Sequence, residues 1–60
     1  IKLNQFLKWA GICDTGGEAD IVISQEKVLV NGRTETRRGK KLYSGDRVTV
    51  YGSEYIVSGE

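Results

Sequence analysis

Basic side chains are the residues of this sequence best suited to chemistry, and they gather in one segment. Positions 33–41 hold five of the nine lysine and arginine residues, namely Arg33, Arg37, Arg38, Lys40 and Lys41. Cations at this density neutralise phosphates, and guanidinium groups bind them through two parallel hydrogen bonds. The formal net charge of +1 conceals the segment because acidic residues predominate between positions 10 and 32. The pattern predicts contact with a nucleic acid, and a solvated hairpin is the alternative.

A second candidate is a polar stripe near the N-terminus. Lys2, Gln5 and Trp9 recur at the spacing of one helix face, with Lys8 further round the same helix. An exposed indole beside cations suits a nucleic acid, because indole stacks on any base. The small size of the core favours the alternative, in which Trp9 covers the sheet.

The Thr15-Gly16-Gly17 turn is a third candidate. Two residues without side chains at the start of a helix leave backbone N–H groups open, and the helix dipole favours an anion there. No Gly-Lys-Ser or Gly-Lys-Thr follows, so the turn is not a P-loop. A simple loop and helix cap is the alternative.

Catalysis and metal binding have few residues available to them. The chain has no histidine and one cysteine, Cys13, which excludes a Ser-His or Cys-His nucleophile and the usual metal sites. We therefore expect no enzyme activity, no metal and no cofactor. A lone cysteine indicates a reducing, cytoplasmic setting, and we expect it to be a small buried apolar residue. No apolar run approaches the length of a membrane span, and no signal peptide is visible.

The first helix is predicted by apolar periodicity. Apolar residues recur at i, i+3, i+4 and i+7 from Leu3 to Ala10, which is one face of a helix. Gly11 then provides a stop just beyond the last apolar position.

A second short helix is predicted over residues 17–25. Thr15 and Glu18 have the spacing of a capping box, and a second apolar stripe follows them. The β-branched run at 21–23 favours a strand instead, but the cap and the spacing favour the helix.

The remainder of the chain is predicted to form short strands. We expect strands over 27–30, 33–37, 47–51 and 54–57. Asn31-Gly32 predicts a type I′ hairpin turn, because both central residues of that turn need positive φ. A basic loop around Gly39, a turn at 44–46 and a turn at Gly52-Ser53 join the other strands. The order of elements predicts one α+β domain over 1–60, with two short N-terminal helices packed on a small antiparallel sheet of four to five strands.

The order of these motifs resembles the RNA-binding domain named after ribosomal protein S-four, also called the alpha-L motif. The matching segments are KLNQFL at 2–7, TGGEA at 15–19, KVLVNGR at 27–33 and GDRV at 45–48. They span nearly the whole chain, and Val-x-Val-Asn-Gly followed at this distance by Gly-Asp is fairly specific. The small stand-alone bacterial members are the most similar. The resemblance implies binding of structured, often ribosomal, RNA by the two helices and the following loop.

Two departures from the family pattern concern charge. Gly16-Gly17 stands where the family usually has an arginine at the start of helix 2, and Gln5 stands where it has a lysine. Glu18 and Asp20 add negative charge nearby, so some of the usual phosphate contacts are absent. The segment 33–41 is expected to compensate for them, or the affinity is lower.

The candidate RNA-binding residues fall into three groups by chemistry. Lysines and arginines would neutralise phosphates, the glycine turn would offer hydroxyl and backbone donors, and two amides would read a 2′-OH or a base edge. They are Lys2, Asn4, Gln5, Lys8, Thr15, Gly16, Gly17, Arg33, Arg37, Arg38, Lys40 and Lys41. The expected partner is a folded RNA recognised by shape, with no membrane and no small-molecule substrate, and the chain is expected to be a monomer.

Two alternatives belong to other classes. One is a protein–protein adaptor that docks through an apolar edge and the surface of Tyr43, Tyr51 and Tyr55. The other is a β-grasp carrier, which needs a terminal Gly-Gly tail, whereas this sequence ends in Val-Ser-Gly-Glu.

Overall fold

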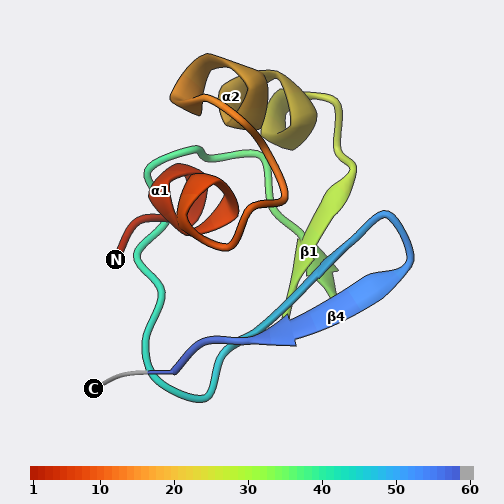
Figure 1. The fold of residues 1–60 in the computed structure, drawn as a ribbon. Coiled ribbons are helices and arrows are strands. Elements are labelled where there is room, and N and C mark those ends of the chain that lie inside the picture. Colours follow the sequence, from red (N-terminus) through yellow and green to blue (C-terminus); the bar gives the residue numbers. More distant parts are fainter. Residues whose placement is uncertain (59–60) are drawn as a thin grey trace.

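Two helices pack on a four-stranded antiparallel sheet in the computed structural model, which describes residues 1–58 (Figure 1). The elements are α1 (Leu3–Trp9), α2 (Gly16–Ser24), β1 (Val28–Val30), β2 (Arg33–Thr34), β3 (Arg47–Val50) and β4 (Ser53–Ile56). The strand order is β2-β1-β3-β4, and every neighbouring pair is antiparallel. The predicted α+β architecture is confirmed, and the sheet has four strands in the described residues.

Helix α1 ends where the sequence predicts. Leu3, Phe6 and Leu7 are buried on one face. Ala10 is the C-terminal cap residue, and Gly11 follows with a φ of 78°. This left-handed conformation is accessible to glycine without steric cost, so Gly11 ends the helix.

Helix α2 is capped by side chains at its start. The Thr15 Oγ1 accepts a hydrogen bond from the Glu18 N–H at 3.1 Å. The Glu18 carboxylate reaches back to the N–H of Asp14 at 2.9 Å, one residue earlier than a standard capping box predicts. The β-branched run does not form a strand, because the helix buries Val22 and Ile23 on one face and leaves the run's first residue exposed.

Both hairpins turn through residues with positive φ. Asn31 and Gly32 have φ of 53° and 84°, which confirms the predicted type I′ turn. The second turn was predicted at Gly52-Ser53, and this is wrong by one residue: Val50 pairs with Ser53, so Tyr51 and Gly52 form the turn. Tyr51 takes a φ of 53° because a primed turn matches the twist of the flanking strands.

Strand β2 is shorter than the sequence predicts. Only Arg33 and Thr34 belong to it, whereas the alternating pattern predicted a strand over 33–37. After Thr34 the carboxylate of Glu35 bonds to the backbone N–H and the guanidinium of Arg37. This local turn directs the chain away from β1 and toward α1.

The core is built of buried apolar side chains from both helices and from the two central strands. Leu3, Leu7, Ile23, Val28 and Val48 are fully buried in it. Cys13 is also buried, as predicted.

Trp9 is not part of this core. The expectation that it covers the sheet is wrong, because 75% of Trp9 is exposed. Phe6, one turn earlier on α1, is the aromatic residue that enters the core, and the Trp9 ring lies beside it with centroids 6.2 Å apart.

Candidate nucleic-acid interface

The start of α1 is capped by the backbone of the basic segment. Lys2 occupies the N-cap position and makes no side-chain capping bond. Instead the N–H of Leu3 donates to the carbonyl of Lys40 at 2.8 Å, and the N–H of Asn4 donates to the carbonyl of Arg38 at 3.1 Å. The first N–H groups of a helix need external acceptors, so these two bonds fix residues 38–40 against α1.

The two residues that flank this contact are also held together. Lys2 and Lys41 form an isolated antiparallel bridge, and the N–H of Leu42 donates to the carbonyl of Ile1 at 2.9 Å. In Figure 1 the segment after β2, green to teal, passes along α1. Cations distant in the sequence therefore meet at the start of α1. We call Lys2, Arg38, Lys40 and Lys41 the basic cluster.

Arg33 joins the edge of the basic cluster. It pairs with Val30, so its side chain lies on the helix-facing side of the sheet. A hollow of about 390 Å³ is lined by Arg33, Lys40 and Lys41. The other lining residues are Val30, Asn31, Glu35, Tyr43 and Asp46.

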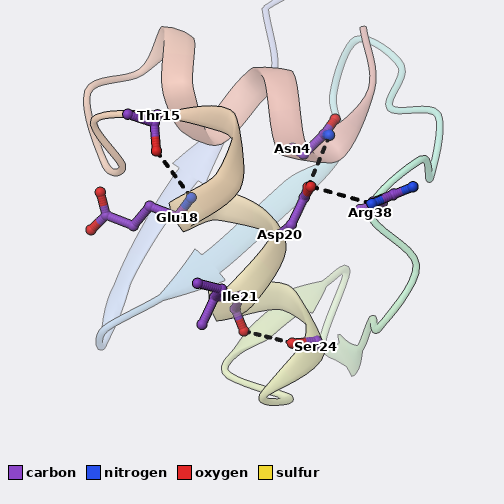
Figure 2. Close-up of polar contacts among 7 residues, drawn as sticks. All are labelled: Asn4, Thr15, Glu18, Asp20, Ile21, Ser24 and Arg38. Atoms are coloured by element: carbon purple, nitrogen blue, oxygen red, sulfur yellow. Dashed lines mark hydrogen bonds and ion pairs between the residues drawn. The ribbon is translucent and has the colours of Figure 1, made fainter.

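Asp20 links both helices to the basic cluster (Figure 2). Its Oδ1 accepts from the Asn4 Nδ2 at 3.0 Å, and its Oδ2 lies 3.4 Å from a terminal guanidinium nitrogen of Arg38. The side chain of Arg38 is still 72% exposed, so it can reach an external anion. Asn4 is half-buried and directs its amide nitrogen at α2 rather than at solvent.

Arg37 is more fully engaged than the other cations of its segment. Its Nε lies 2.9 Å from the Glu35 Oε2, and its backbone N–H donates to the same oxygen at 2.9 Å. These hydrogen bonds, the side-chain bond foremost, lower the pKa of Glu35 to about 2. The Glu35 carboxylate therefore offsets the charge of Arg37 in any contact that Arg37 makes with a phosphate.

The remaining site candidates lie apart from the basic cluster. Asp20, in the middle of α2, contacts the first turn of α1, so α2 begins near the opposite end of α1. Lys8 lies in the last turn of α1, and Thr15, Gly16 and Gly17 begin the next helix, so these candidates lie toward the end of α1 opposite the basic cluster. The Thr15 hydroxyl oxygen already accepts the capping bond from Glu18. Gln5 is exposed on α1 between the two groups.

The Val-x-Val-Asn-Gly and Gly-Asp segments are hydrogen-bonded to each other, a contact that the sequence pattern did not predict. The Asn31 Oδ1 accepts from the N–H of Arg47 at 2.9 Å, and the Asn31 Nδ2 donates to Asp46 at 3.2 Å. The other oxygen of Asp46 accepts from the N–H of Tyr43 at 2.8 Å. The Tyr43 bond and then the Asn31 bond lower the pKa of Asp46. Val-x-Val-Asn-Gly and Gly-Asp thus fasten the sheet to the segment that carries the basic cluster.

Other kinds of site find little support among residues 1–58. No group of three or more potential metal-ligating side chains is present there. Burial, together with the nearby Glu18 and Asp14, raises the pKa of the Cys13 thiol, which disfavours the reactive thiolate. None of the helices in this range has the length and apolar character needed to cross a bilayer.

The tyrosines of the adaptor alternative do not form one surface. Tyr43 precedes β3 and Tyr51 follows it, so these two exposed residues lie beyond opposite ends of the strand. Tyr55 pairs with Val48 and packs partly against the core.

Two short helices on a four-stranded antiparallel sheet, with cations gathered at the start of the first helix, define a small α+β module. A family model described as "S4 domain" matches residues 1–58. The chain belongs to the S4 domain family.

The chain matches two curated relatives over most of their length. The chain is 48% identical over 60 residues to the "Probable ribosome maturation protein RlbA" of Bacillus subtilis (strain 168), covering 97% of this chain and 84% of that protein. It is 33% identical over 57 residues to the "Putative RNA-binding protein YbcJ" of Escherichia coli (strain K12), covering 95% and 81%.

Proposed function

We propose that this chain binds structured RNA, with ribosomal RNA as the target class, and that it performs no catalysis. The observation that carries the proposal is the basic cluster, because the backbone bonds between residues 38–42 and 1–4 bring separate cations to one place. The names of the two relatives, one referring to ribosome maturation and one to RNA binding, support the same class. We expect the chain to act as a single cytoplasmic domain and as a monomer.

The basic cluster would supply the phosphate contacts. Arg38 and Lys41 are exposed, and Lys2 lies beside Lys41. Each phosphate that they neutralise releases counterions, so the affinity falls with rising salt. Lys8 and the Thr15-Gly16-Gly17 turn would extend the same contact along α1.

Recognition of RNA shape fits this molecule better than base stacking on the sheet. The pairing register places Thr34, Leu29, Thr49 and Glu54 on the solvent-facing side of the sheet. That side has no row of aromatic rings of the kind on which single-stranded bases stack. The cations instead lie at the side of α1, where they can follow the backbone of a folded RNA.

The test is a titration of labelled ribosomal RNA fragments at several salt concentrations, with a DNA duplex of equal charge as competitor. We expect binding that prefers folded RNA and weakens with salt by about 0.7–0.9 in log K per log salt for each phosphate contact. The double variant Arg37→Ala/Arg38→Ala should bind more weakly and flatten this slope. Lys27→Ala/Arg47→Ala removes the same charge outside the segment 33–41 and is the matched control.

Two results would overturn the proposal. One is the absence of RNA binding even at low salt. The other is an equal change of affinity and of salt slope in the Arg37→Ala/Arg38→Ala variant and in its control.

A further inference from the structure

A second hollow, which the basic cluster does not account for, lies beside α1. It has a volume of about 250 Å³ and is lined mainly by apolar side chains. The lining residues are Ile1, Phe6, Trp9, Leu42, Ser44, Val57 and Ser58. Asn4 faces α2, and Trp9 is five residues further along α1, which places the hollow on the other flank of the helix. We call it the apolar hollow.

The size and lining of the apolar hollow suit one flat, uncharged ring system. Its volume is below the roughly 300–1,000 Å³ of pockets for drug-sized ligands. No side chain that lines it is ionisable, and the two serines offer hydroxyl groups as donors or acceptors. Trp9 is 75% exposed, so most of its indole is free to take a stacked ring.

The charges around the apolar hollow favour a ring attached to an anion. Lys2, Lys41 and Lys8 are the immediate chain neighbours of the lining residues Ile1, Leu42 and Trp9. All three lysines are exposed, and Lys2 and Lys41 belong to the basic cluster. A planar apolar group next to a negative charge is the chemistry of a nucleotide.

We propose that the apolar hollow takes one unpaired nucleobase, which stacks on Trp9 while its flanking phosphates lie on Lys2 and Lys41. The inference rests on the proposed RNA binding and adds a specificity to it: the chain prefers a folded RNA with a base outside the helical stack. Base–aromatic stacking tolerates every base, so the preference is for the unpaired state rather than for one base identity.

The experiment uses two RNA hairpins that differ at one position. The first carries a single unpaired adenosine in its stem, and the second has a uridine opposite to pair it. Trp9 is the one tryptophan of the chain, so its fluorescence reports on the apolar hollow directly. We expect the hairpin with the unpaired adenosine to bind more tightly and to quench the fluorescence more strongly.

Variants separate stacking from charge. Trp9→Ala should lower the affinity for the hairpin with the unpaired adenosine by roughly 5- to 150-fold, the range seen when a stacking aromatic is removed. It should leave the affinity for the fully paired hairpin unchanged. Trp9→Phe should retain part of the preference. Tyr51→Ala removes a similarly exposed aromatic residue from the far hairpin turn and should change neither affinity.

The outcomes separate this inference from the proposed function. Equal, salt-dependent binding of both hairpins with unchanged Trp9 fluorescence overturns the inference and leaves the proposed function standing. Binding of neither hairpin at low salt overturns both.

Discussion

At the scale of single residues, Asp20 pairs with one cation of the basic cluster, Arg38. Its two oxygens bind Asn4 and Arg38, so one carboxylate fixes the packing of α1 on α2 and offsets a cation (Figure 2). The ion pair is partly exposed, and such pairs contribute little to stability. Its larger effect should therefore be on binding.

Asp20→Asn should increase the affinity for RNA. The amide keeps an oxygen that can accept from Asn4 but no longer neutralises Arg38, so we expect tighter binding by up to about fivefold. The steepness of the salt dependence should also increase, because one more cation is free to bind a phosphate. Titrations at several salt concentrations measure both quantities. Glu54→Gln removes the same charge from the far side of the sheet, and an equal gain in that variant would contradict a local effect.

The Glu35 carboxylate predicts a dependence of stability on pH. Its pKa is lowered from 4.5 to about 2 by Arg37, so the folded state favours the ionised form. The resulting stabilisation is fully present above pH 4.5 and is lost as the pH falls through about 2. The lowered pKa of Asp46 acts in the same direction.

Glu35→Gln should flatten the loss of stability in that pH window. Urea unfolding midpoints at pH 6, 4 and 3 measure the effect, and we expect the parent to lose more stability than the variant. Glu26→Gln alters an exposed carboxylate that makes none of the ion pairs found among residues 1–58, and it should follow the parent. A parent and a Glu35→Gln variant with parallel pH profiles would show that the Arg37 contact is absent in solution.

At the scale of elements, the β1–β2 turn and the turn before β3 hold each other. Asn31 takes a positive φ in its own turn and uses both ends of its amide on Asp46 and Arg47. The N–H of Asn31 also donates to the carbonyl of Arg47 at 2.7 Å. One side chain therefore sets the conformation of a turn and the position of the next segment.

Asn31→Ala should cost about 1–3 kcal/mol of unfolding free energy. The variant loses the side-chain hydrogen bonds, and alanine adopts the left-handed conformation less readily than asparagine does. Asn31→Gly keeps the backbone conformation and should cost less than the alanine variant. Urea denaturation measures the difference. Ser24→Ala removes an exposed local hydrogen bond on α2 and should stay within about 0.5 kcal/mol of the parent. Equal costs for Asn31→Ala and Asn31→Gly would mean that positive φ contributes nothing here.

At the scale of the whole molecule, the hydrophobic core and the basic cluster share one segment. Leu42 is buried among core residues, and the residues just before it carry Arg38, Lys40 and Lys41. The N–H of Leu42 is bonded to Ile1, which closes the segment against the start of α1. Burial of one leucine therefore helps to position the cations that precede it in the chain.

Leu42→Ala should weaken both folding and RNA binding. Truncation of a buried leucine costs about 2–5 kcal/mol, which is a large fraction of the stability of a domain of this size. Denaturation gives the folded fraction, and RNA affinity corrected for that fraction should still fall, because the basic segment is no longer fastened. Val28→Ala, a buried truncation in β1, which carries no cation of the basic cluster, should lose stability and keep its corrected affinity. If Leu42→Ala also keeps its corrected RNA affinity, the position of the basic cluster does not depend on Leu42.

The sequence alone determined the elements whose causes lie within a few residues. Apolar spacing and Gly11 gave α1, the Thr15–Glu18 cap gave α2 against the preference of its β-branched run, and Asn31-Gly32 gave the first hairpin. These features depend on contacts between near neighbours, which a sequence pattern records. The concentration of cations in 33–41 was visible for the same reason.

Only the tertiary structure decided which of those cations meet and which are offset. The ties from Asp20 to Asn4 and to Arg38 span 16 and 18 positions, and the tie from Asn31 to Asp46 spans 15. No periodicity encodes such pairs, because they depend on how the helices dock and where the chain leaves β2. Trp9 shows the same limit: its type suggested the core, but Phe6 and the leucines of α1 had already filled the buried face. Competition for a finite buried volume is a property of the assembled molecule.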